Sequence, residues 1–281
     1  MSVSVSILKT LNKLFPQVEH PFNLQADGKQ TYAQWQFQWG KRTVECFAPK
    51  FTPEDIFKGK TVLDMGCGAS GKSLYYISIG AEKVVGVDVV EHYKAEAEAF
   101  AEELGYSDKF TFLLGDALNL AIDDNTFDVV IMNDFVEHIY DPERALQEAL
   151  RVLKPGGRIF VNFPPYFHPT GAHLSDVIGI PWVHMLFSEK TLIAAYKDLV
   201  KGVPDEQDRL SLRFGTDETG VEHITYINKM TIKRFHRILE KLNITPYWYQ
   251  ELPLRKYFAL FAKVPGLKEM FVRMCVCVIE K

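Results

Sequence analysis

The sequence predicts a doubly wound α/β fold with a mostly parallel sheet, and the main evidence is an alternation of strand-like and helix-like segments. Apolar, β-rich runs occur at 61–65, 83–90, 109–116, 127–134 and 158–163. Helical patterns lie between them at 72–80, 92–105 and 142–153. This alternation indicates βαβ units, which place the carboxyl ends of parallel strands along one edge of the sheet. Open α/β sheets bind their ligands at that edge.

The segments outside this alternation predict an N-terminal cap and an insertion. Residues 1–59 have helical and aromatic character, which suits a cap over the ligand edge or, equally, a packed extension. We expect one domain at 60–281, with an insertion at about 164–230 that follows the fifth strand. The insertion begins at 164–187 with a stretch rich in Pro, Gly, His and aromatic residues, which predicts neither a strand nor a long helix. We expect substrate contacts there. The run at 274–281 predicts an antiparallel last strand.

The composition is that of an ordinary globular protein. The formal net charge is −4 and the pI is about 6.1, without a long basic block, so we expect no nucleic-acid partner. The four cysteines form no CxxC pair, which favours reduced thiols and a cytoplasmic location. The N-terminus is too polar for a signal peptide, and no run of about 18 uncharged apolar residues occurs. We therefore expect a soluble protein without stable membrane insertion.

A glycine-rich turn after the first strand is the strongest local signal. The spacing Gly66-x-Gly68-x-x-Gly71, with Asp88 further on, fits a dinucleotide-binding fingerprint as well as other nucleoside sites. Glycine there lets the backbone approach a ligand closely. Asp64 decides between these readings, because its carboxylate would repel a pyrophosphate but accepts hydrogen bonds from a cationic amino-acid ligand. S-adenosylmethionine carries an ammonium and a sulfonium group and has no phosphate.

From about Lys60 to Phe163, these motifs and their order resemble the class I S-adenosylmethionine-dependent methyltransferases, particularly the group that includes quinone-biosynthesis methyltransferases. The resemblance implies a Rossmann-like sheet of seven strands, with the last one antiparallel. It also implies S-adenosylmethionine as the cofactor. The residues that it places around the cofactor are Asp64, Gly66, Cys67, Gly68, Asp88, Asp116, Ala117, Asn133, Asp134 and Phe135.

The resemblance also implies a role for several of these residues. Asp88 would accept hydrogen bonds from both ribose hydroxyls. Asp116 would accept one from the adenine amino group, while Ala117 offers its backbone N–H. The segment 133–135 faces the reactive side of the cofactor, and the turn at 153–157 is structural.

The catalytic and acceptor-binding residues are less clearly marked. Glu137 and His138 follow the fourth strand, where a histidine can take a proton from the acceptor, although a structural role is equally compatible with that position. In the insertion, aromatic and histidine side chains suit a partly apolar pocket, or alternatively simple packing; they are Tyr166, His168, His173, Trp182 and His184. Because the histidine spacing matches no compact ligand motif, we expect no metal.

The segment 252–274 mixes apolar residues with cations, as an interfacial amphipathic stretch does. Its cations are Arg255, Lys256, Lys263, Lys268 and Arg273. Pro253 and Pro265 interrupt the pattern, which favours a packed helical connection before the last strand and leaves transient membrane contact as the alternative.

Taken together, the sequence predicts methyl transfer to an oxygen or carbon of a small aromatic or lipophilic molecule. N-methylation, a non-catalytic cofactor-binding protein and a nicotinamide-dependent oxidoreductase are the alternatives. The acceptor itself and the oligomeric state stay open.

Overall fold

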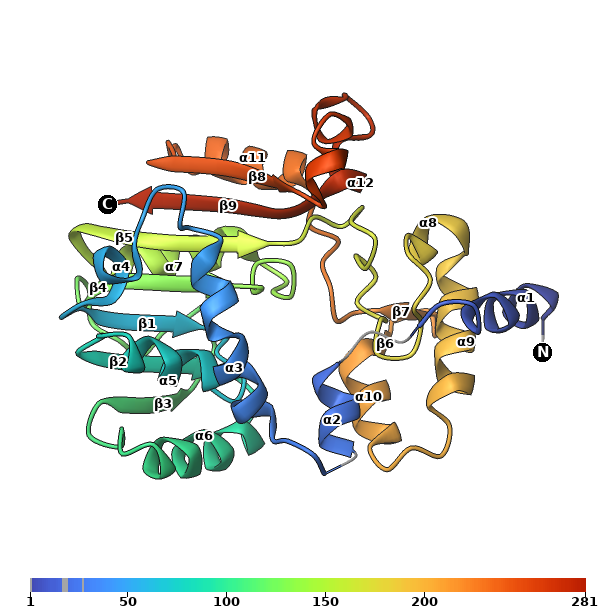
Figure 1. Ribbon diagram of the computed structural model, residues 1–281, viewed down its shortest axis with the longest axis horizontal. Coiled ribbons are helices and arrows are strands. Elements are labelled where there is room, and N and C mark those ends of the chain that lie inside the picture. The colour runs from blue at the N-terminus through green and yellow to red at the C-terminus, as the bar shows by residue number, and fades with distance from the viewer. Residues whose placement is uncertain (1, 17–19, 27) are drawn as a thin grey trace. The chain divides into compact units, whose positions relative to one another are not determined.

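The computed structural model describes residues 2–16, 20–26 and 28–281, which form two compact units (Figure 1). The first, here called the sheet unit, comprises residues 30–163, 233–252 and 274–281. The second, here called the insertion unit, comprises residues 1–29, 164–232 and 253–273. The segment predicted as an N-terminal cap thus contributes to both units. The boundary at residue 59 stays a prediction.

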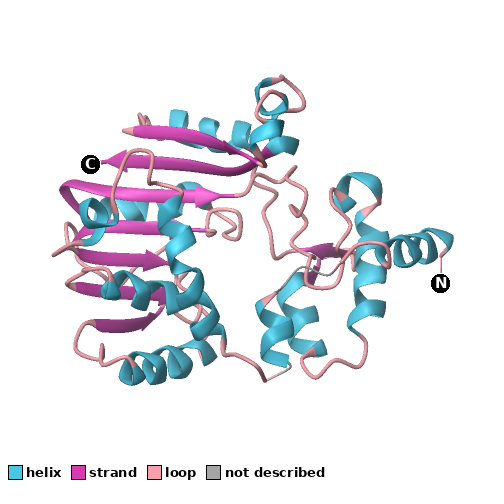
Figure 2. Ribbon diagram, in the orientation of Figure 1, coloured by secondary structure: helices cyan, strands magenta, loops and turns pink. Residues whose placement is uncertain are grey.

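The sheet unit contains the predicted sheet of seven strands (Figure 2). They are β1 (Thr61–Met65), β2 (Lys83–Asp88), β3 (Phe110–Leu114), β4 (Phe127–Asn133), β5 (Leu153–Phe163), β8 (Trp248–Pro253) and β9 (Val272–Glu280). Their order is β3-β2-β1-β4-β5-β9-β8. The strands β1 to β5 pair in parallel, and β9 pairs antiparallel to β5. The predicted fold class, including its antiparallel last strand, is confirmed.

The helices of the sheet unit cover both faces of the sheet. They are α3 (Tyr32–Glu45), α4 (Pro53–Phe57), α5 (Gly71–Ser78), α6 (His92–Glu103), α7 (Pro142–Val152) and α11 (Ile232–Lys241). Alternate strand residues such as Val62, Ile131 and Phe160 share one buried cluster with side chains of α3, α4 and α5. On the other face, the ring of Phe163 lies 4.9 Å from that of Phe235 in α11. Both faces of the sheet are therefore covered by helices and shielded from solvent, as is usual for parallel sheets.

The insertion unit is mainly helical. Its elements are α1 (Val3–Asn12), α2 (Pro21–Ala26), α8 (Val183–Leu186), α9 (Glu189–Val200), α10 (Glu206–Arg213), β6 (Phe214–Thr216), β7 (Glu222–Ile224), two 3₁₀ turns (Lys256–Phe258 and Phe261–Lys263) and α12 (Lys268–Phe271). Val5 and Leu8 of α1 pack with Leu192 and Tyr196 of α9 in its core. Residues 164–182 form no helix or strand, as the sequence predicts.

A buried ionic cluster lies inside the insertion unit. Asp176, which has no exposed surface, lies 2.9 Å from Nη2 of Arg213 and 3.3 Å from Nη1 of Arg209. The hydroxyl of Tyr196 donates a hydrogen bond of 2.6 Å to the same carboxylate. Asn23 accepts from Arg209 at 2.8 Å, which ties α2 to α10. Asp176 therefore holds together segments that are far apart in the sequence.

Candidate cofactor and active site

The turn between β1 and α5 is shaped by two glycines with left-handed backbone conformations. Gly66 has φ 74° and Gly68 has φ 56°, a region that side chains with a Cβ rarely adopt. The N–H groups of Gly66 and Cys67 both donate to the carbonyl of Val87 in β2, at 2.8 and 3.1 Å. A Cβ on Gly66 would lie 2.2 Å from the ring of Phe135. The turn thus brings the first strand end into contact with the segment after β4.

Asp88, at the end of β2, is tied to this turn. One of its carboxylate oxygens accepts from the N–H of Gly68 at 2.8 Å and the other from the N–H of Val90 at 3.0 Å. Burial raises the pKa of Asp88, while these two backbone donors act in the opposite direction. Each carboxylate oxygen has a further lone pair, so two neighbouring hydroxyls can donate to it as the sequence predicts.

Gln36 of α3 forms hydrogen bonds with both ends of the glycine turn, and the sequence did not predict this role. Its amide nitrogen donates to the carbonyl of Cys67 at 3.2 Å, and its amide oxygen accepts from the N–H of Gly71 at 3.1 Å. Gln36 itself is buried. The only signal in the sequence is a glutamine within an aromatic helix, Trp35-Gln36-Phe37, where a buried amide needs a partner.

The third glycine of the motif serves helix packing. A Cβ on Gly71 would lie 1.9 Å from the carbonyl oxygen of Ala33 and 2.6 Å from the backbone nitrogen of Phe37, both in α3. Helix α3 therefore lies directly against the first turn of α5. The sequence interpretation that glycines here make room for a ligand stays a prediction for Gly66 and Gly68, and at Gly71 the space is taken by protein backbone.

Asp64 lies at the end of β1 and is buried. The hydroxyl of Ser73 in α5 donates a hydrogen bond of 2.6 Å to its carboxylate. Burial raises the pKa of Asp64 to about 6, against the opposing effects of that hydrogen bond and of Lys72. Its charge near neutral pH makes it the natural partner for an ammonium group.

Cys67 occupies the turn with its side chain directed into the protein. Its Sγ accepts from the Ser70 hydroxyl at 3.1 Å, and a Cβ on Gly86 of β2 would lie 2.9 Å from it. Burial raises the pKa of this thiol well above its ordinary value. Its side chain therefore packs under the turn, and only its backbone is available to a ligand on the outer side.

Asp116 and Ala117 follow β3. The Asp116 carboxylate accepts from the N–H of Leu118 at 2.9 Å, which forms a local turn, and Ala117 is buried. Directly before them, the N–H of Gly115 donates to the carbonyl of Asp88 at 3.0 Å. The ends of β2 and β3 are therefore linked by the backbone.

The segment after β4 is held by a small polar network. Asp134 has a left-handed backbone with φ 47°. Its carboxylate accepts from the Asn133 amide at 2.9 Å and lies 3.3 Å from Nζ of Lys72 in α5. The carbonyl oxygen of the buried Asn133 side chain accepts no hydrogen bond within the part of the chain that the structure describes. A polar acceptor is thus left available at this strand end.

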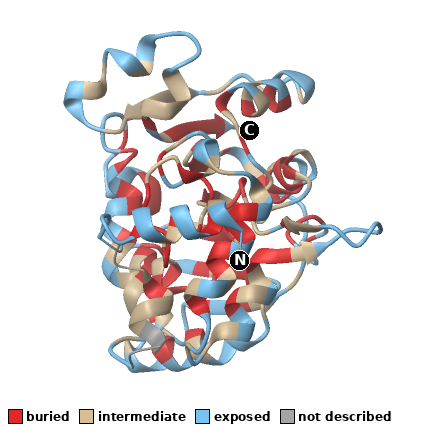
Figure 3. Ribbon diagram, turned by 90° about the vertical axis from the view of Figure 1, so that its right-hand side faces the viewer, coloured by how far each residue is buried: buried red, intermediate tan, exposed pale blue. Residues whose placement is uncertain are grey.

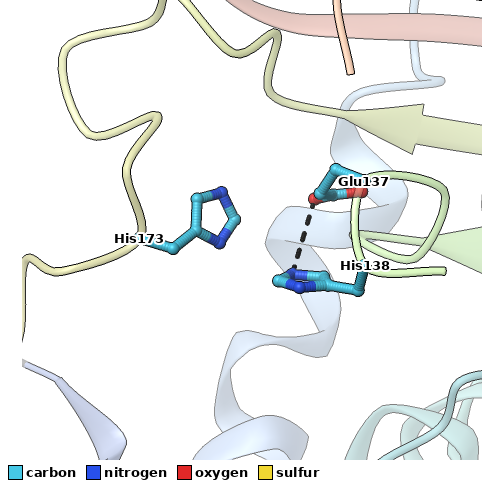
Figure 4. Close-up of side chains that lie close together, drawn as sticks. All are labelled: Glu137, His138 and His173. Carbon is cyan, nitrogen blue, oxygen red and sulfur yellow. Dashed lines mark ion pairs between the residues drawn. The ribbon is translucent and has the colours of Figure 1, made fainter. Parts of the chain in front are cut away.

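Glu137 and His138 face each other just beyond this network (Figure 4). His138 Nε2 lies 3.9 Å from Oε1 of Glu137. Glu137 is buried, and neither carboxylate oxygen accepts a hydrogen bond from another of the described residues. Burial, together with the charge of Asp134, raises the pKa of Glu137 well above its ordinary value. A buried carboxyl group with a shifted pKa at a strand end is typical of catalytic sites.

The aromatic and histidine residues predicted to bind substrate all lie in the insertion unit, and four of the five belong to three separate ring pairs. The ring of Tyr166 lies 4.8 Å from that of His184, Trp182 lies 6.0 Å from Phe271, and His173 lies 6.2 Å from Tyr226.

Burial lowers the pKa of both His168 and His184 to about 4. Their rings are therefore uncharged at neutral pH. The role of the five residues in substrate binding stays a prediction, as does the absence of a metal.

Comparison with known protein families identifies the centre of the sheet unit. Residues 63–161 match the family model described as a methyltransferase domain. Residues 63–161 carry a methyltransferase domain. This confirms the resemblance seen in the sequence, and S-adenosylmethionine is the cofactor of the class. The matched range runs from the first strand to the fifth and includes every predicted cofactor residue.

Relatives of this methyltransferase domain act on varied small molecules, as their names state. The norajmaline N-methyltransferase of Rauvolfia serpentina is 34% identical over 104 residues, which are 37% of this chain and 36% of that protein. The ubiquinone/menaquinone biosynthesis C-methyltransferase of Idiomarina loihiensis is 26% identical over 68% of this chain and 74% of that protein. The chain spans about a third of the length of several relatives, among them the norajmaline N-methyltransferase.

A solved structure shares the fold of the methyltransferase domain. It is that of a geranyl diphosphate methyltransferase in complex with S-adenosylmethionine, with a TM-score of 0.54, 16% identity and coverage of 93% of this chain and 91% of that one. At this identity the likeness shows the fold alone.

Among the residues that the structure describes, no helix is long and apolar enough to cross a membrane.

Proposed function

We propose that this chain binds S-adenosylmethionine at the carboxyl ends of β1 to β4 and transfers its methyl group to an oxygen or carbon of a small aromatic or lipophilic acceptor. One observation carries the choice of cofactor. In a dinucleotide site, the pyrophosphate lies at the N-terminus of the helix after the first strand. Here Ala33 and Phe37 of α3 lie against Gly71, and the side-chain oxygen of Gln36 already accepts the hydrogen bond of the Gly71 N–H. This arrangement excludes a pyrophosphate and leaves the strand-end carboxylates available.

The residues of the site fit the parts of S-adenosylmethionine. Asp64 provides a negative charge for the ammonium group, and the Gly66–Gly68 turn provides backbone groups for the methionine moiety. Asp88 accepts from the ribose hydroxyls, and Asp116 with Ala117 recognises the adenine edge. The polar and aromatic groups of 133–135 lie toward the reactive end.

S-adenosylmethionine supplies a methyl group that its sulfonium already activates, so the protein contributes mainly by positioning and by excluding water. We propose that His138 accepts the proton of a hydroxyl acceptor. Glu137, whose Oε1 lies 3.9 Å from Nε2 of His138, would position the imidazole for this step. The rings of Tyr166 and Trp182, the uncharged imidazoles of His168 and His184, and the side chain of His173 would contact the acceptor.

Calorimetric titration tests the cofactor proposal. We expect S-adenosylmethionine and S-adenosylhomocysteine to bind and nicotinamide dinucleotides not to bind. In Asp88→Asn, S-adenosylmethionine should bind about 10- to 100-fold more weakly, because the ribose hydroxyls lose a charged acceptor.

His138→Gln provides the matched comparison, with S-adenosylmethionine affinity within about twofold and the rate of labelled methyl transfer to a panel of phenols, quinols and amines about 100-fold lower. Binding of a nicotinamide dinucleotide alone would overturn the proposal. Binding without turnover on any acceptor would point to a non-catalytic protein. A labelled product methylated on nitrogen would replace the O or C assignment, and the name of the norajmaline relative supports that alternative.

The affinity for S-adenosylmethionine should rise with pH as Asp64 ionises. Burial raises the pKa of Asp64 to about 6, so its carboxyl group is mostly protonated at about pH 5 and mostly charged at about pH 7. The α-amino and α-carboxyl groups of the cofactor keep their charges across this window. We expect about a tenfold gain in affinity between these two values, measured by calorimetry. Asp64→Asn should bind more weakly and show no such gain. The same pH slope in Asp64→Asn would assign the titration to another group.

A further inference from the structure

The excursion between β8 and β9, residues 254–271 of the insertion unit, exposes its apolar side chains. No residue in its helical turns is buried, and in Figure 3 this upper loop carries only the colours of intermediate and exposed residues. Leu260 is 76% exposed and Tyr257 is 65% exposed, with Phe261, Val264 and Leu267 also exposed. Exposed apolar side chains gathered in one short segment in this way mark an interaction surface.

The same excursion, with Arg273 directly after it, is strongly cationic. It carries Arg255, Lys256, Lys263, Lys268 and Arg273 against a single acid, Glu269, in a chain whose formal net charge is −4. All but Lys268 of these cations are exposed. Positive charge is thus gathered where apolar side chains are exposed, and a partner for this surface must be both negatively charged and apolar.

Contacts between residues of the excursion itself stabilise its conformation. The N–H of Leu254 donates to the carbonyl of Phe271 at 2.7 Å, which closes its base. Inside, the ring of Phe271 lies 5.0 Å from Phe258 and 5.2 Å from Phe261. These rings form a small support, and Tyr257, whose ring lies 4.6 Å from that of Phe258, stays 65% exposed beside it. The exposed face is therefore preformed, and its helical pieces of three or four residues suit contact with a surface.

We propose that residues 254–273 dock this protein onto an anionic lipid bilayer, with Tyr257, Leu260 and Val264 entering the headgroup region and the cations contacting lipid phosphates. Cations beside a bilayer with anionic lipids are attracted to its negative surface potential, and exposed aromatic and aliphatic side chains gain by leaving water. A lipid surface offers both the negative charge and the apolar layer. This inference does not depend on the identity of the methyl acceptor.

Co-sedimentation of the full chain with vesicles tests this proposal. We expect binding to phosphatidylcholine vesicles that contain phosphatidylglycerol, weak binding to pure phosphatidylcholine, and release by salt, since salt screens the attraction. Leu260→Asp should weaken binding to the anionic vesicles roughly tenfold or more. Lys263→Glu should weaken it roughly tenfold.

Two matched controls keep the test specific. Leu14, also in the insertion unit and also 76% exposed, gives Leu14→Asp, and the exposed Lys201 gives Lys201→Glu. Both should bind vesicles like the unchanged protein, and circular dichroism should show that all four variants are folded. The proposal is overturned if the unchanged protein does not bind anionic vesicles, or if the loop variants bind as well as the controls. Self-association that Leu260→Asp abolishes, without vesicle binding, would instead assign the loop to a protein interface and overturn it. Cofactor titration of the same variants is a separate measurement, so failure here leaves the proposed function untouched.

Discussion

Replacing Asp176 by alanine is expected to lower the free energy of unfolding by about 3–5 kcal/mol. Asp176 has no exposed surface, and it is paired with two arginines that are themselves buried, Arg209 and Arg213. Its removal leaves Arg213 in the interior without a counter-charge, and it leaves Arg209 with Asp205, 2.9 Å from its Nε, as its remaining acid partner. It also leaves the buried hydroxyl of Tyr196 without its acceptor. The aromatic faces around Arg213, such as Phe22 at 5.0 Å, offset only part of this cost.

Thermal and urea denaturation measure this effect, and Asp198→Ala is the matched control. Asp198 also pairs with a cation, Lys9 at 3.1 Å, but at the surface, where such a pair contributes about 1 kcal/mol or less. Asp176→Ala should unfold the insertion unit at a markedly lower temperature, whereas Asp198→Ala should change the midpoint little. Equal effects of the two variants would show that the cluster does not depend on charge compensation.

A feature could be predicted from the sequence when the residues that form it lie close together along the chain. Asp64, Asp88 and Asn133 lie at the ends of their own strands and Asp116 lies just after its strand. Local alternation was therefore enough to place them at one edge. Gln36 could not be found this way, because its two partners lie 31 and 35 residues further along the chain and meet it only once α3 packs on α5.

The insertion shows the same limit. The sequence predicted that residues 164–187 form neither a strand nor a long helix, and their rich content of Pro and Gly is sufficient for that. The pairing of Asp176 with Asn23, 153 residues away, rests on tertiary packing that no local pattern records. For residues 254–271 the sequence favoured a packed helical connection, but the helical pieces are short and unburied. Pro253 and Pro265 prevent one continuous helix, and short turns present no apolar stripe wide enough to pack.

Gly71→Ala is expected to destabilise the protein by about 3 kcal/mol and to weaken S-adenosylmethionine binding, because it forces α3 away from α5. The added Cβ would lie 1.9 Å from the carbonyl oxygen of Ala33, which is backbone and cannot rotate away. As α3 moves, Gln36 loses its hold on both ends of the glycine turn. Denaturation and calorimetric titration of the same variant should therefore change together.

Two further glycine-to-alanine variants distinguish the effect of a steric clash from the effect of adding a methyl group in open space. Gly115→Ala has its nearest neighbour at 4.0 Å, so we expect a change in stability of about 1 kcal/mol or less. Gly40→Ala meets Cγ and Cβ of Tyr75 at 2.4 and 2.6 Å. Because this Cβ is fixed to the backbone of α5 and is kept in Tyr75→Ala, Gly40→Ala should also lose stability, and Tyr75→Ala should relieve only the part that is due to the ring. If Gly71→Ala were as stable as Gly115→Ala and bound S-adenosylmethionine normally, α3 would not be fixed on α5. The exclusion of a pyrophosphate would then lose its structural basis, since it depends on the same contact.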